Sequence, residues 1–387
     1  MLKKQFLLSI IISVILLGTF AVNTQALEIE APSAILMEAE TGQVLYEKNP
    51  DEKRPPASIT KIMTMLLVME YAEKGEVDFD EEVTISEYAA SMGGSQIYLG
   101  ANDKLTIEEL MEAVTIASAN DASVALAETI GGSYNNFIEM MNEKASELGM
   151  DNTKFVNSTG LPAADEEHYS TAYDIAIMSR EIVEYEKVLE WATIWMDHLN
   201  LGDRKAMLVN TNKLINNYPD LDGLKTGHTQ SAGFCLAATA RRDDMRLISV
   251  ILGADTEKQK DEETAKLLNY GFNSFNKEVI IEEGEKVDDI NIPNGEKRFV
   301  SGYIDEDLKV ALQRGEEDEL EIETKIKDDI SAPISKGDVV GQRIVKLDGE
   351  ELGMVNIVAE EDVKKASIFV RLWRSFVNWI GSFLENK

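Results

Sequence analysis

The chain changes in character once, near residue 276, and this change constrains its fold more than any other feature. Between about residues 31 and 275, long helical periods alternate with a few apolar strands. From 277 to 360, short apolar runs at 279–281, 320–322 and 339–340 are separated by Gly, Pro and acidic turns. We therefore expect a domain that mixes helices and strands over 27–276, followed by a small all-β domain over 277–360.

Strand patterns lie at both ends of the first domain, and helical patterns lie between them. Residues 33–46 predict a hairpin that turns at 40–42, and 233–253 predict two strands joined at 242–244. Both ends of the domain are therefore expected to contribute to one sheet within an α/β unit. Helical periods cover 59–73, 106–131, 134–148, 171–185 and 260–275.

The N-terminus has the pattern of a signal peptide. Lys3 and Lys4 precede an apolar stretch at 6–22, and a small-residue cleavage site ends at Ala26. We expect residues 1–26 to direct export and to be removed, the alternative being an uncleaved anchor. The single cysteine, Cys235, permits no intrachain disulfide and is expected to pack as a small buried hydrophobe, so an exported form must be stable through packing alone.

The C-terminal segment 361–387 predicts an amphipathic helix over 366–386. Arg371 and Arg374 lie on its polar face, whereas Trp373 lies on the opposite, apolar face. An arginine near the middle of a bilayer costs about 2.5–3.5 kcal/mol, so the segment is expected to lie in the interface of the membrane rather than cross it. The alternative is a helix that packs on its own protein.

The net charge argues against nucleic-acid binding, and the positions of the histidines argue against a zinc site. The formal net charge is −32, from 70 acidic and 38 basic residues, which argues against a nucleic-acid binder with a basic surface. The three histidines, His168, His198 and His228, fall in different predicted elements without the carboxylate spacing of a zinc site. We expect neither a metal nor a cofactor.

Ser58 and Lys61 form the first candidate catalytic pair. They lie three residues apart at the start of the apolar helix 59–73, so their side chains share one face. The free N–H groups of a helix N-terminus stabilise a developing oxyanion, and burial beside a second cation lowers the pKa of a lysine enough for it to act as a base. The same S-x-x-K spacing recurs at Ser274–Lys277, where it is expected to mark only the end of a helix.

Two further elements follow in order along the chain. Ser118 and Asn120 lie between two helical stretches of small and apolar residues, where a hydroxyl and an amide need hydrogen-bond partners. The run from Lys225 through Thr226 and Gly227 to His228 precedes the strand at 232–240. On an edge strand beside a cleft, this run offers an ammonium group, a hydroxyl group and a glycine that permits close backbone approach.

The motifs S-x-x-K, S-x-N and K-T-G in this order resemble the signature of penicillin-binding proteins and serine β-lactamases. The match narrows to the low-molecular-mass penicillin-binding proteins that are serine-type D-alanyl-D-alanine carboxypeptidases. It extends over nearly the whole chain, and the stretches that carry it are 31–38, 149–157 with Gly160 and Leu161, 168–174, and 225–233. The resemblance implies an α/β (α+β) transpeptidase/β-lactamase-like domain, with an antiparallel sheet flanked by helices, followed by a small all-β domain and a C-terminal amphipathic helix.

The resemblance also implies a role for each motif residue. Ser58 is the expected nucleophile toward the D-Ala-D-Ala end of a peptidoglycan stem peptide, and Lys61 takes its proton. Ser118 relays a proton to the departing D-Ala. The remaining roles are substrate binding by Asn120, carboxylate binding by Lys225 and Thr226, and an oxyanion hole from the backbone N–H groups of Ser58 and His228, beside Gly227.

Some assignments stay open at this point. Relatives tend to carry an arginine as a further cation for the substrate carboxylate, whereas this chain offers Lys258 or Lys260. The stretch 94–97 resembles a loop at the edge of the family's cleft and receives no role. The same motifs also suit a D,D-endopeptidase or a serine β-lactamase. The β-lactamase class lacks the second domain and the tail, and 153–157 holds no glutamate to activate a deacylating water. β-Lactams are therefore expected to acylate the protein, and the acyl-enzyme is expected to persist. The protein itself is expected at the outer face of the cytoplasmic membrane.

Overall fold

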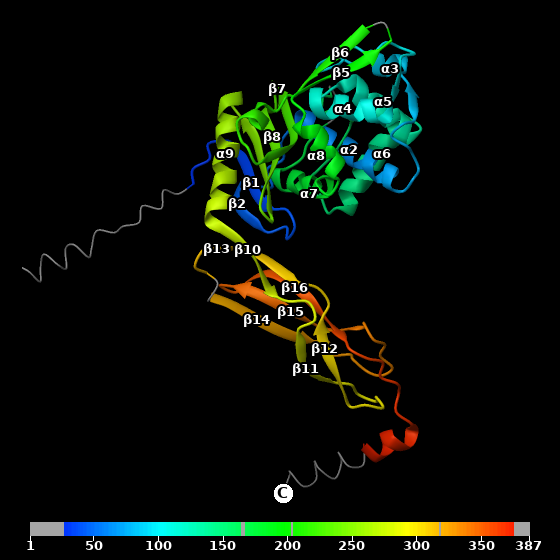
Figure 1. Cartoon of the computed structure of the whole chain (residues 1–387), viewed down its shortest axis with the longest axis vertical. Helices are drawn as coiled ribbons and strands as arrows, with labels where there is room; N and C mark the ends of the chain where they lie inside the picture. Colours follow the sequence, from blue (N-terminus) through cyan, green and yellow to red (C-terminus); the bar gives the residue numbers. More distant parts are fainter. Residues whose placement is uncertain (1–26, 164–166, 203, 317–318, 375–387) are drawn as a thin grey trace, which may run out of the picture.

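The computed structural model describes residues 27–163, 167–202, 204–316 and 319–374. The predicted signal peptide over 1–26 and the end of the predicted tail, 375–387, lie outside these residues. Figure 1 shows an elongated molecule, with the helix-rich part at one end, an all-β part in the middle and a short helical segment at the other end.

A five-stranded antiparallel sheet organises the first part in the order β2-β1-β9-β8-β7. The hairpin predicted at 33–46 is β1 (Ser33–Glu38) and β2 (Val44–Lys48), and the pair predicted at 233–253 is β8 (Gly233–Arg242) and β9 (Met245–Ala254). β7 (Leu221–Thr229) adds the edge strand that carries the K-T-G motif. The predicted sheet, built from both ends of the domain, is confirmed.

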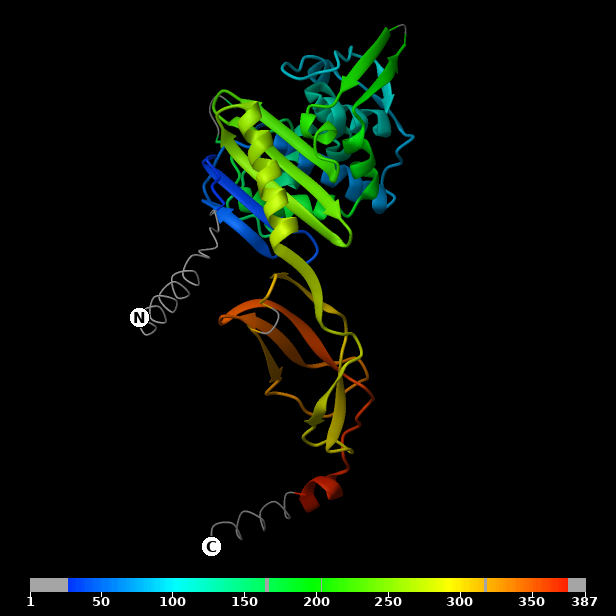
Figure 2. The same ribbon diagram turned by 60° about the vertical axis from the view of Figure 1, so that its left-hand side comes forward.

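Helices cover both faces of this sheet. α9 (Glu257–Ser274) lies across one face, as Figure 2 shows, and packs on β8 and β9. The other face carries the helical layer of α2 (Lys61–Glu73), α4 (Ile107–Ala117), α5 (Asn120–Gly131), α6 (Tyr134–Glu147), α7 (Ala172–Ile182) and α8 (Glu186–Thr193). Side chains alternate between the two faces of β1, so this strand contributes to the hydrophobic core on each face. Ile35 and Met37 face the helical layer, whereas Ala34 and Leu36 face α9.

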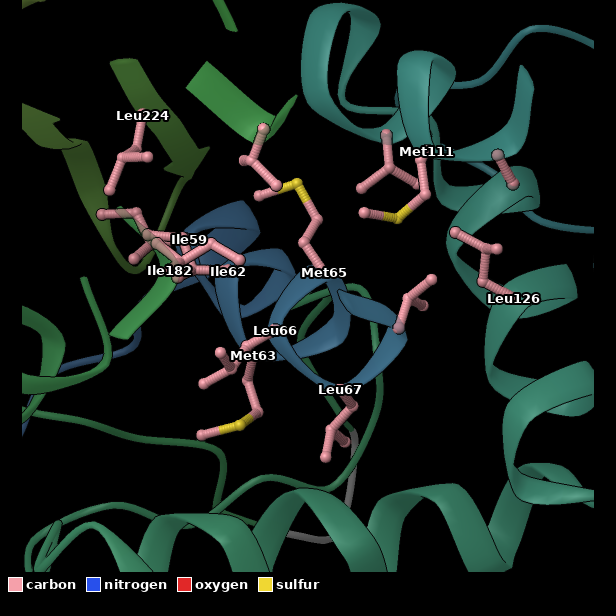
Figure 3. Close-up of a cluster of buried hydrophobic side chains, with 14 of the residues drawn as sticks. Ile59, Ile62, Met63, Met65, Leu66, Leu67, Met111, Leu126, Ile182 and Leu224 are labelled. Carbon is pink, nitrogen blue, oxygen red and sulfur yellow. The ribbon is translucent and has the colours of Figure 1, made fainter. Parts of the chain in front are cut away.

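α2 is the buried centre of the helical layer. Figure 3 shows its side chains pointing to different sides of the helix, with Met65 on one side and Met63 and Leu67 on another. A helix that is apolar all round must be enclosed on every side, and its residues from Lys61 to Met69 are all buried. This enclosure fixes the position of the turn that precedes α2, which carries Ser58.

The predicted helices differ from the observed ones mainly at their ends. The period at 106–131 is broken at Ser118, whose backbone is left-handed (φ 58°, ψ 32°), so α4 and α5 are separate helices. α9 begins at Glu257, before the predicted 260, because Thr256 accepts a hydrogen bond from Gln259 N. Several short elements were not predicted: α3 (Glu87–Ala90), α8, the antiparallel pair of β3 (Glu82–Thr84) with β4 (Lys104–Thr106), and the hairpin of β5 (Met196–Leu201) with β6 (Arg204–Val209).

The second part is all β, as expected. Five strands, in the order β11-β12-β16-β15-β14, form one sheet: β11 (Lys286–Asn291), β12 (Phe299–Ile304), β14 (Leu320–Ile326), β15 (Val339–Leu347) and β16 (Glu350–Ala359). β10 (Phe275–Ile281) follows α9 directly and pairs with β13 (Leu308–Gln313). Gln43 joins the two parts, because its side-chain amide exchanges hydrogen bonds of 2.8 and 2.9 Å with the backbone of Ala311.

Candidate active site

Ser58 lies on a single 3₁₀ turn, Ala57–Thr60, that leads directly into α2. Its hydroxyl accepts a hydrogen bond of 3.0 Å from Lys61 Nζ. The lysine also donates to the carbonyl oxygen of Thr159 at 2.8 Å, and none of its surface is exposed. The i, i+3 spacing therefore brings the two side chains together as expected, and Thr159 O is a further contact that the motif does not reveal.

Two glycines let the chain close around this turn. A Cβ on Gly160 would lie 1.7 Å from the carbonyl oxygen of Ala57, and Gly160 itself has φ +78°. A Cβ on Gly227 would lie 2.8 Å from the carbonyl oxygen of Pro56 and 3.2 Å from Ser58 N. The segment after Thr159 and the edge strand β7 thus approach the Ser58 turn at backbone contact distance, which only glycine allows.

Ser118 stands at the break between α4 and α5. Its left-handed conformation ends α4, and Ser118 N donates to the carbonyl oxygen of Ala113. The turn places Ser118 on the wall of a cavity of about 280 Å³ that Ser58 also lines. Ser58 and Ser118 are 60 residues apart in the sequence, and the packing of α2 on α5 brings them to the same cavity.

Asn120 is buried at the start of α5, with 2% of its surface exposed. Its Nδ2 donates to the carbonyl oxygen of Gly93 at 2.6 Å, and its backbone N–H donates to Ser95 O at 2.7 Å. Within the described parts of the chain, its Oδ1 has no hydrogen-bond partner. Asn120 therefore ties down the 93–95 segment and keeps one amide oxygen available.

The neighbouring Asp121 fixes the rest of that segment. Its buried carboxylate accepts hydrogen bonds from the backbone N–H groups of Ile97 and Leu99, at 3.1 and 3.0 Å. Ser95 consequently lies on the cavity wall. The stretch 94–97, which received no role from the sequence, thus forms part of the site, and Asp121, which the sequence analysis did not single out, holds it there.

The K-T-G run contributes the opposite wall from β7. Thr226, Gly227 and His228 line the cavity, and Thr226 Oγ1 donates to Thr211 Oγ1 at 2.7 Å. The imidazole of His228 is exposed and stacks on Phe234, with ring centroids 4.1 Å apart. Thr211 and Phe234 are further wall residues that sequence reasoning missed, because neither lies in a motif.

Lys225 is the buried member of this run. Only 1% of its surface is exposed, and Nζ has no hydrogen-bond partner among the described residues. Burial, together with the nearby charge of Lys260, lowers the pKa of Lys225 to about 7. Burial also holds the pKa of Lys61 well below its usual value, and the charge of Lys225 acts in the same direction. Burial thus favours the neutral form of both lysines.

The structure distinguishes the two candidate cations that the sequence left open. Lys260 is 2% exposed and lines the cavity, and its Nζ lies 3.1 Å from Asp261 Oδ1. The side chain of Lys258 is 82% exposed and pairs with Glu262 on the helix surface. Lys260, and not Lys258, is therefore the third lysine at the site.

The remaining residues of interest lie apart from this cluster. His168 is buried between Thr60 and Val156, and His198 lies on the exposed strand β5. Cys235 is buried, as expected, and burial raises the pKa of its thiol to about 11. The second S-x-x-K is the end of a helix, as expected, because α9 ends at Ser274 and Lys277 forms ion pairs with Glu38 and Glu40.

A larger cavity, of about 510 Å³, adjoins the site at Gly160 and Thr229.

Comparison with known proteins identifies this arrangement. Residues 20–256 match the model of a family described as D-alanyl-D-alanine carboxypeptidase. The chain belongs to this family. Residues 275–365 of this carboxypeptidase family member also match the C-terminal domain of penicillin-binding protein 5. The resemblance in sequence and the expected fold are thereby confirmed.

Individual relatives of the carboxypeptidase support the same family membership. D-alanyl-D-alanine carboxypeptidase DacF of Bacillus subtilis is 42% identical over 97% of this chain and 99% of its own. The structure of penicillin binding protein 5 from Haemophilus influenzae, 32% identical, superposes with a TM-score of 0.79 over 87% of this chain and 98% of that one. Penicillin-Binding Protein D2 from Listeria monocytogenes, in its ampicillin-bound form, is 33% identical, with a TM-score of 0.56 over 64% of this chain and 98% of that one.

Proposed function

We propose that this chain removes the terminal D-Ala from peptidoglycan stem peptides through an acyl-enzyme on Ser58. The observation that carries the proposal is the 3.0 Å hydrogen bond between Lys61 Nζ and Ser58 Oγ, made by a fully buried lysine with a lowered pKa. Burial favours the neutral amine of this lysine, and a neutral amine can accept the serine proton as the hydroxyl oxygen attacks a carbonyl carbon.

In the proposed acylation step, Ser58 Oγ attacks the carbonyl carbon between the two D-Ala residues while its proton passes to Lys61. The backbone N–H groups of Ser58 and His228 stabilise the oxyanion, a role supported by the close approach of β7 to the Ser58 turn at Gly227. Ser118 relays a proton to the departing amine, and the peptide bond breaks. Water then attacks the ester, which releases the shortened peptide and restores Ser58.

Substrate binding follows from the charges of the cavity. We assign the terminal carboxylate to Lys225 and Thr226, with Lys260 as the further cation. The unpaired amide oxygen of Asn120 suits a backbone N–H of the substrate. Burial of Lys225 without a hydrogen-bond partner, beside the charge of Lys260, is unfavourable, and a substrate carboxylate relieves this repulsion.

The proposal includes acylation by β-lactams, for which the ampicillin-bound relative gives support. A β-lactamase must also hydrolyse the acyl-enzyme quickly, and a carboxylate is the usual base for this step in class A enzymes. Glu257 is the carboxylate on the cavity wall, and it forms an ion pair of 2.9 Å with Lys213. We therefore propose that a penicilloyl adduct persists.

We also propose that the protein acts outside the cytoplasm, exported by residues 1–26 and held peripherally at the outer leaflet of the membrane by 361–387. Within the described ranges, no helix has the length and apolar character needed to cross a bilayer. In the helical residues 368–374, Phe369 is 81% exposed, Leu372 64% and Trp373 67%. This apolar face supports the proposed contact with lipid.

Two measurements test the proposed activity and its location. The purified chain is incubated with a linear peptide ending in D-Ala-D-Ala, with a cross-linked dimer of such peptides, and with benzylpenicillin. We expect D-Ala release from the linear peptide; faster cleavage of the dimer indicates an endopeptidase, and rapid penicillin turnover a β-lactamase. A chain truncated before Lys364 should fail to pellet with membranes, and membrane binding by that chain contradicts the anchor.

A further inference from the structure

A small basic cavity lies at the end of the second domain, beside the C-terminal helix. Its volume is about 230 Å³, and its walls come from the turn 291–298 between β11 and β12 and from the helical residues 368–374. Figure 1 shows this helix at the end of the molecule farthest from α4 and α5. The cavity is therefore separate from the active site. It is lined by Asn291, Ile292, Pro293, Asn294, Arg298, Arg371 and Arg374.

Specific contacts hold the two walls together. Ala366 N donates to Asn294 O at 2.7 Å, just before the helix begins. The guanidinium group of Arg374 donates to the carbonyl oxygens of Gly295 and Glu296, at 2.7 and 3.0 Å. The polar face of the helix is thus fixed against the turn, and the geometry of the cavity does not depend on flexible side chains alone.

The cavity brings three guanidinium groups together in a strongly acidic protein. Arg298, Arg371 and Arg374 line it, although the whole chain carries a net charge of −32. Segments 291–298 and 361–374 together hold six basic and three acidic residues. Within the described residues, the buried Nε of Arg371 has no hydrogen-bond acceptor. Planar guanidinium groups with unused donors match the oxygens of a phosphate group.

The apolar face of the same helix indicates where that phosphate comes from. Phe369 and Leu372 of this helix are 81% and 64% exposed. A free phosphate ion would leave these side chains in water. A phospholipid presents its phosphate at the depth of the interface where Trp and Phe side chains are buried, so one ligand accounts for both faces.

We propose that this cavity binds the phosphate of an anionic phospholipid headgroup, with Arg298 and Arg371 as its principal donors. The inference rests on the membrane association proposed above and adds a defined binding site to it. Arg374 is the positioning residue, because two of its N–H groups donate to the carbonyl oxygens of the turn. The site would orient the elongated protein on the membrane rather than merely attract it.

The test separates a built site from diffuse electrostatic attraction by substitutions that keep the charge. Full-length chains carrying Arg298→Lys or Arg371→Lys are compared with wild type for binding to vesicles of phosphatidylcholine, with and without phosphatidylglycerol. Lysine retains the charge but loses the planar pair of donors, so we expect roughly tenfold weaker binding to the phosphatidylglycerol vesicles. Arg241→Lys, an exposed arginine of the first domain, is the matched control and should bind as wild type does.

Each outcome decides the matter. Equal binding by all four proteins overturns the site and leaves the membrane anchor standing, whereas failure of wild type to bind either vesicle removes the anchor and the site together. Inorganic phosphate is titrated without vesicles at constant ionic strength. Saturable phosphate binding that Arg298→Lys abolishes, with unchanged vesicle binding, assigns the cavity to free phosphate and overturns the lipid assignment. Thermal unfolding and D-Ala release verify that the variants fold.

Discussion

Lys61 Nζ lies 3.0 Å from Ser58 Oγ, and the same nitrogen donates to the carbonyl oxygen of Thr159 at 2.8 Å. The carbonyl contact orients the lysine, and the enclosure of α2 removes it from water. Both effects serve the proposed chemistry, since a base must be aimed at the proton it takes and must be able to lose its own.

Replacing Lys61 with arginine should abolish this function while retaining the positive charge. Arginine does not release its proton in proteins, so it cannot act as the base. We expect Lys61→Arg to slow acylation by benzylpenicillin roughly a thousandfold, as measured by stopped-flow or intact mass. Lys258→Arg, at an exposed position of α9, is the control. An acylation rate within tenfold of wild type in Lys61→Arg would show that Lys61 is not the base.

The pH dependence of kcat/KM should be bell-shaped. On the acidic side the rate rises as Lys61, whose pKa is lowered, loses its proton and becomes a base. On the alkaline side it falls as Lys225, with a pKa of about 7, loses the charge that binds the carboxylate. Lys225→Arg keeps that charge at all these pH values. Its alkaline limb should therefore move upward by more than one pH unit, and an unchanged limb would refute the role of Lys225.

Gly160→Ala should be far more damaging than an alanine at another glycine with the same backbone conformation. Gly160 and Gly149 have φ of +78° and +73°, but a Cβ on Gly160 meets Ala57 O at 1.7 Å, whereas one on Gly149 meets nothing within 4 Å. Urea unfolding should show a loss of about 1 kcal/mol for Gly149→Ala, from the left-handed backbone alone. For Gly160→Ala we expect about 3 kcal/mol or more, with slower acylation. Equal losses would contradict the close packing at Ser58.

The three motifs could be recognised in the sequence because each is a short run, before α2, at the α4–α5 break and along β7, and because their order resembles a known family signature. The residues that complete the site depend on packing between distant segments. Lys258 and Lys260 differ by two positions on one helix, and only the docking of α9 on the sheet decides that Lys260 faces the cavity. Thr159 O and Thr211 contribute through tertiary contacts that leave no pattern in the sequence.

The same reasoning explains which elements were missed. α8 has eight residues, and β5 and β6 have six each, so each element leaves only a short pattern in the sequence. The sequence places Ser118 between two helical stretches, but propensity alone does not predict a left-handed backbone at this non-glycine residue. The domain boundaries at 276 and 360 stay a prediction from composition, although α9 ends at Ser274 and β10 begins at the next residue.

Acid should destabilise the protein through His168. Its Nδ1 accepts a hydrogen bond from Val156 N, its Nε2 donates to Thr60 Oγ1 at 2.7 Å, and burial lowers its pKa to about 4. A histidine with a lowered folded pKa takes up a proton more readily when unfolded. Its contribution to stability is therefore complete above pH 6.5 and is lost as pH falls toward 4, by up to about 3 kcal/mol.

The comparison is made between wild type, His168→Gln and His198→Gln in urea unfolding at pH 7.5 and pH 4.5. His168→Gln should be less stable at pH 7.5 and should lose less stability on acidification than wild type. His198, on the exposed strand β5, serves as the control and should leave the pH dependence as it is. A wild-type pH dependence in His168→Gln would show that other groups account for the acid sensitivity.

The central claim is that Ser58 becomes acylated. The most direct measurement is peptide mapping by mass spectrometry after incubation with benzylpenicillin, on wild type, Ser58→Ala and Ser274→Ala, the serine of the second S-x-x-K. The account predicts a penicilloyl adduct on the peptide that contains Ser58 in wild type and in Ser274→Ala, and none in Ser58→Ala. An adduct that persists in Ser58→Ala, or an unmodified wild-type protein, would contradict it.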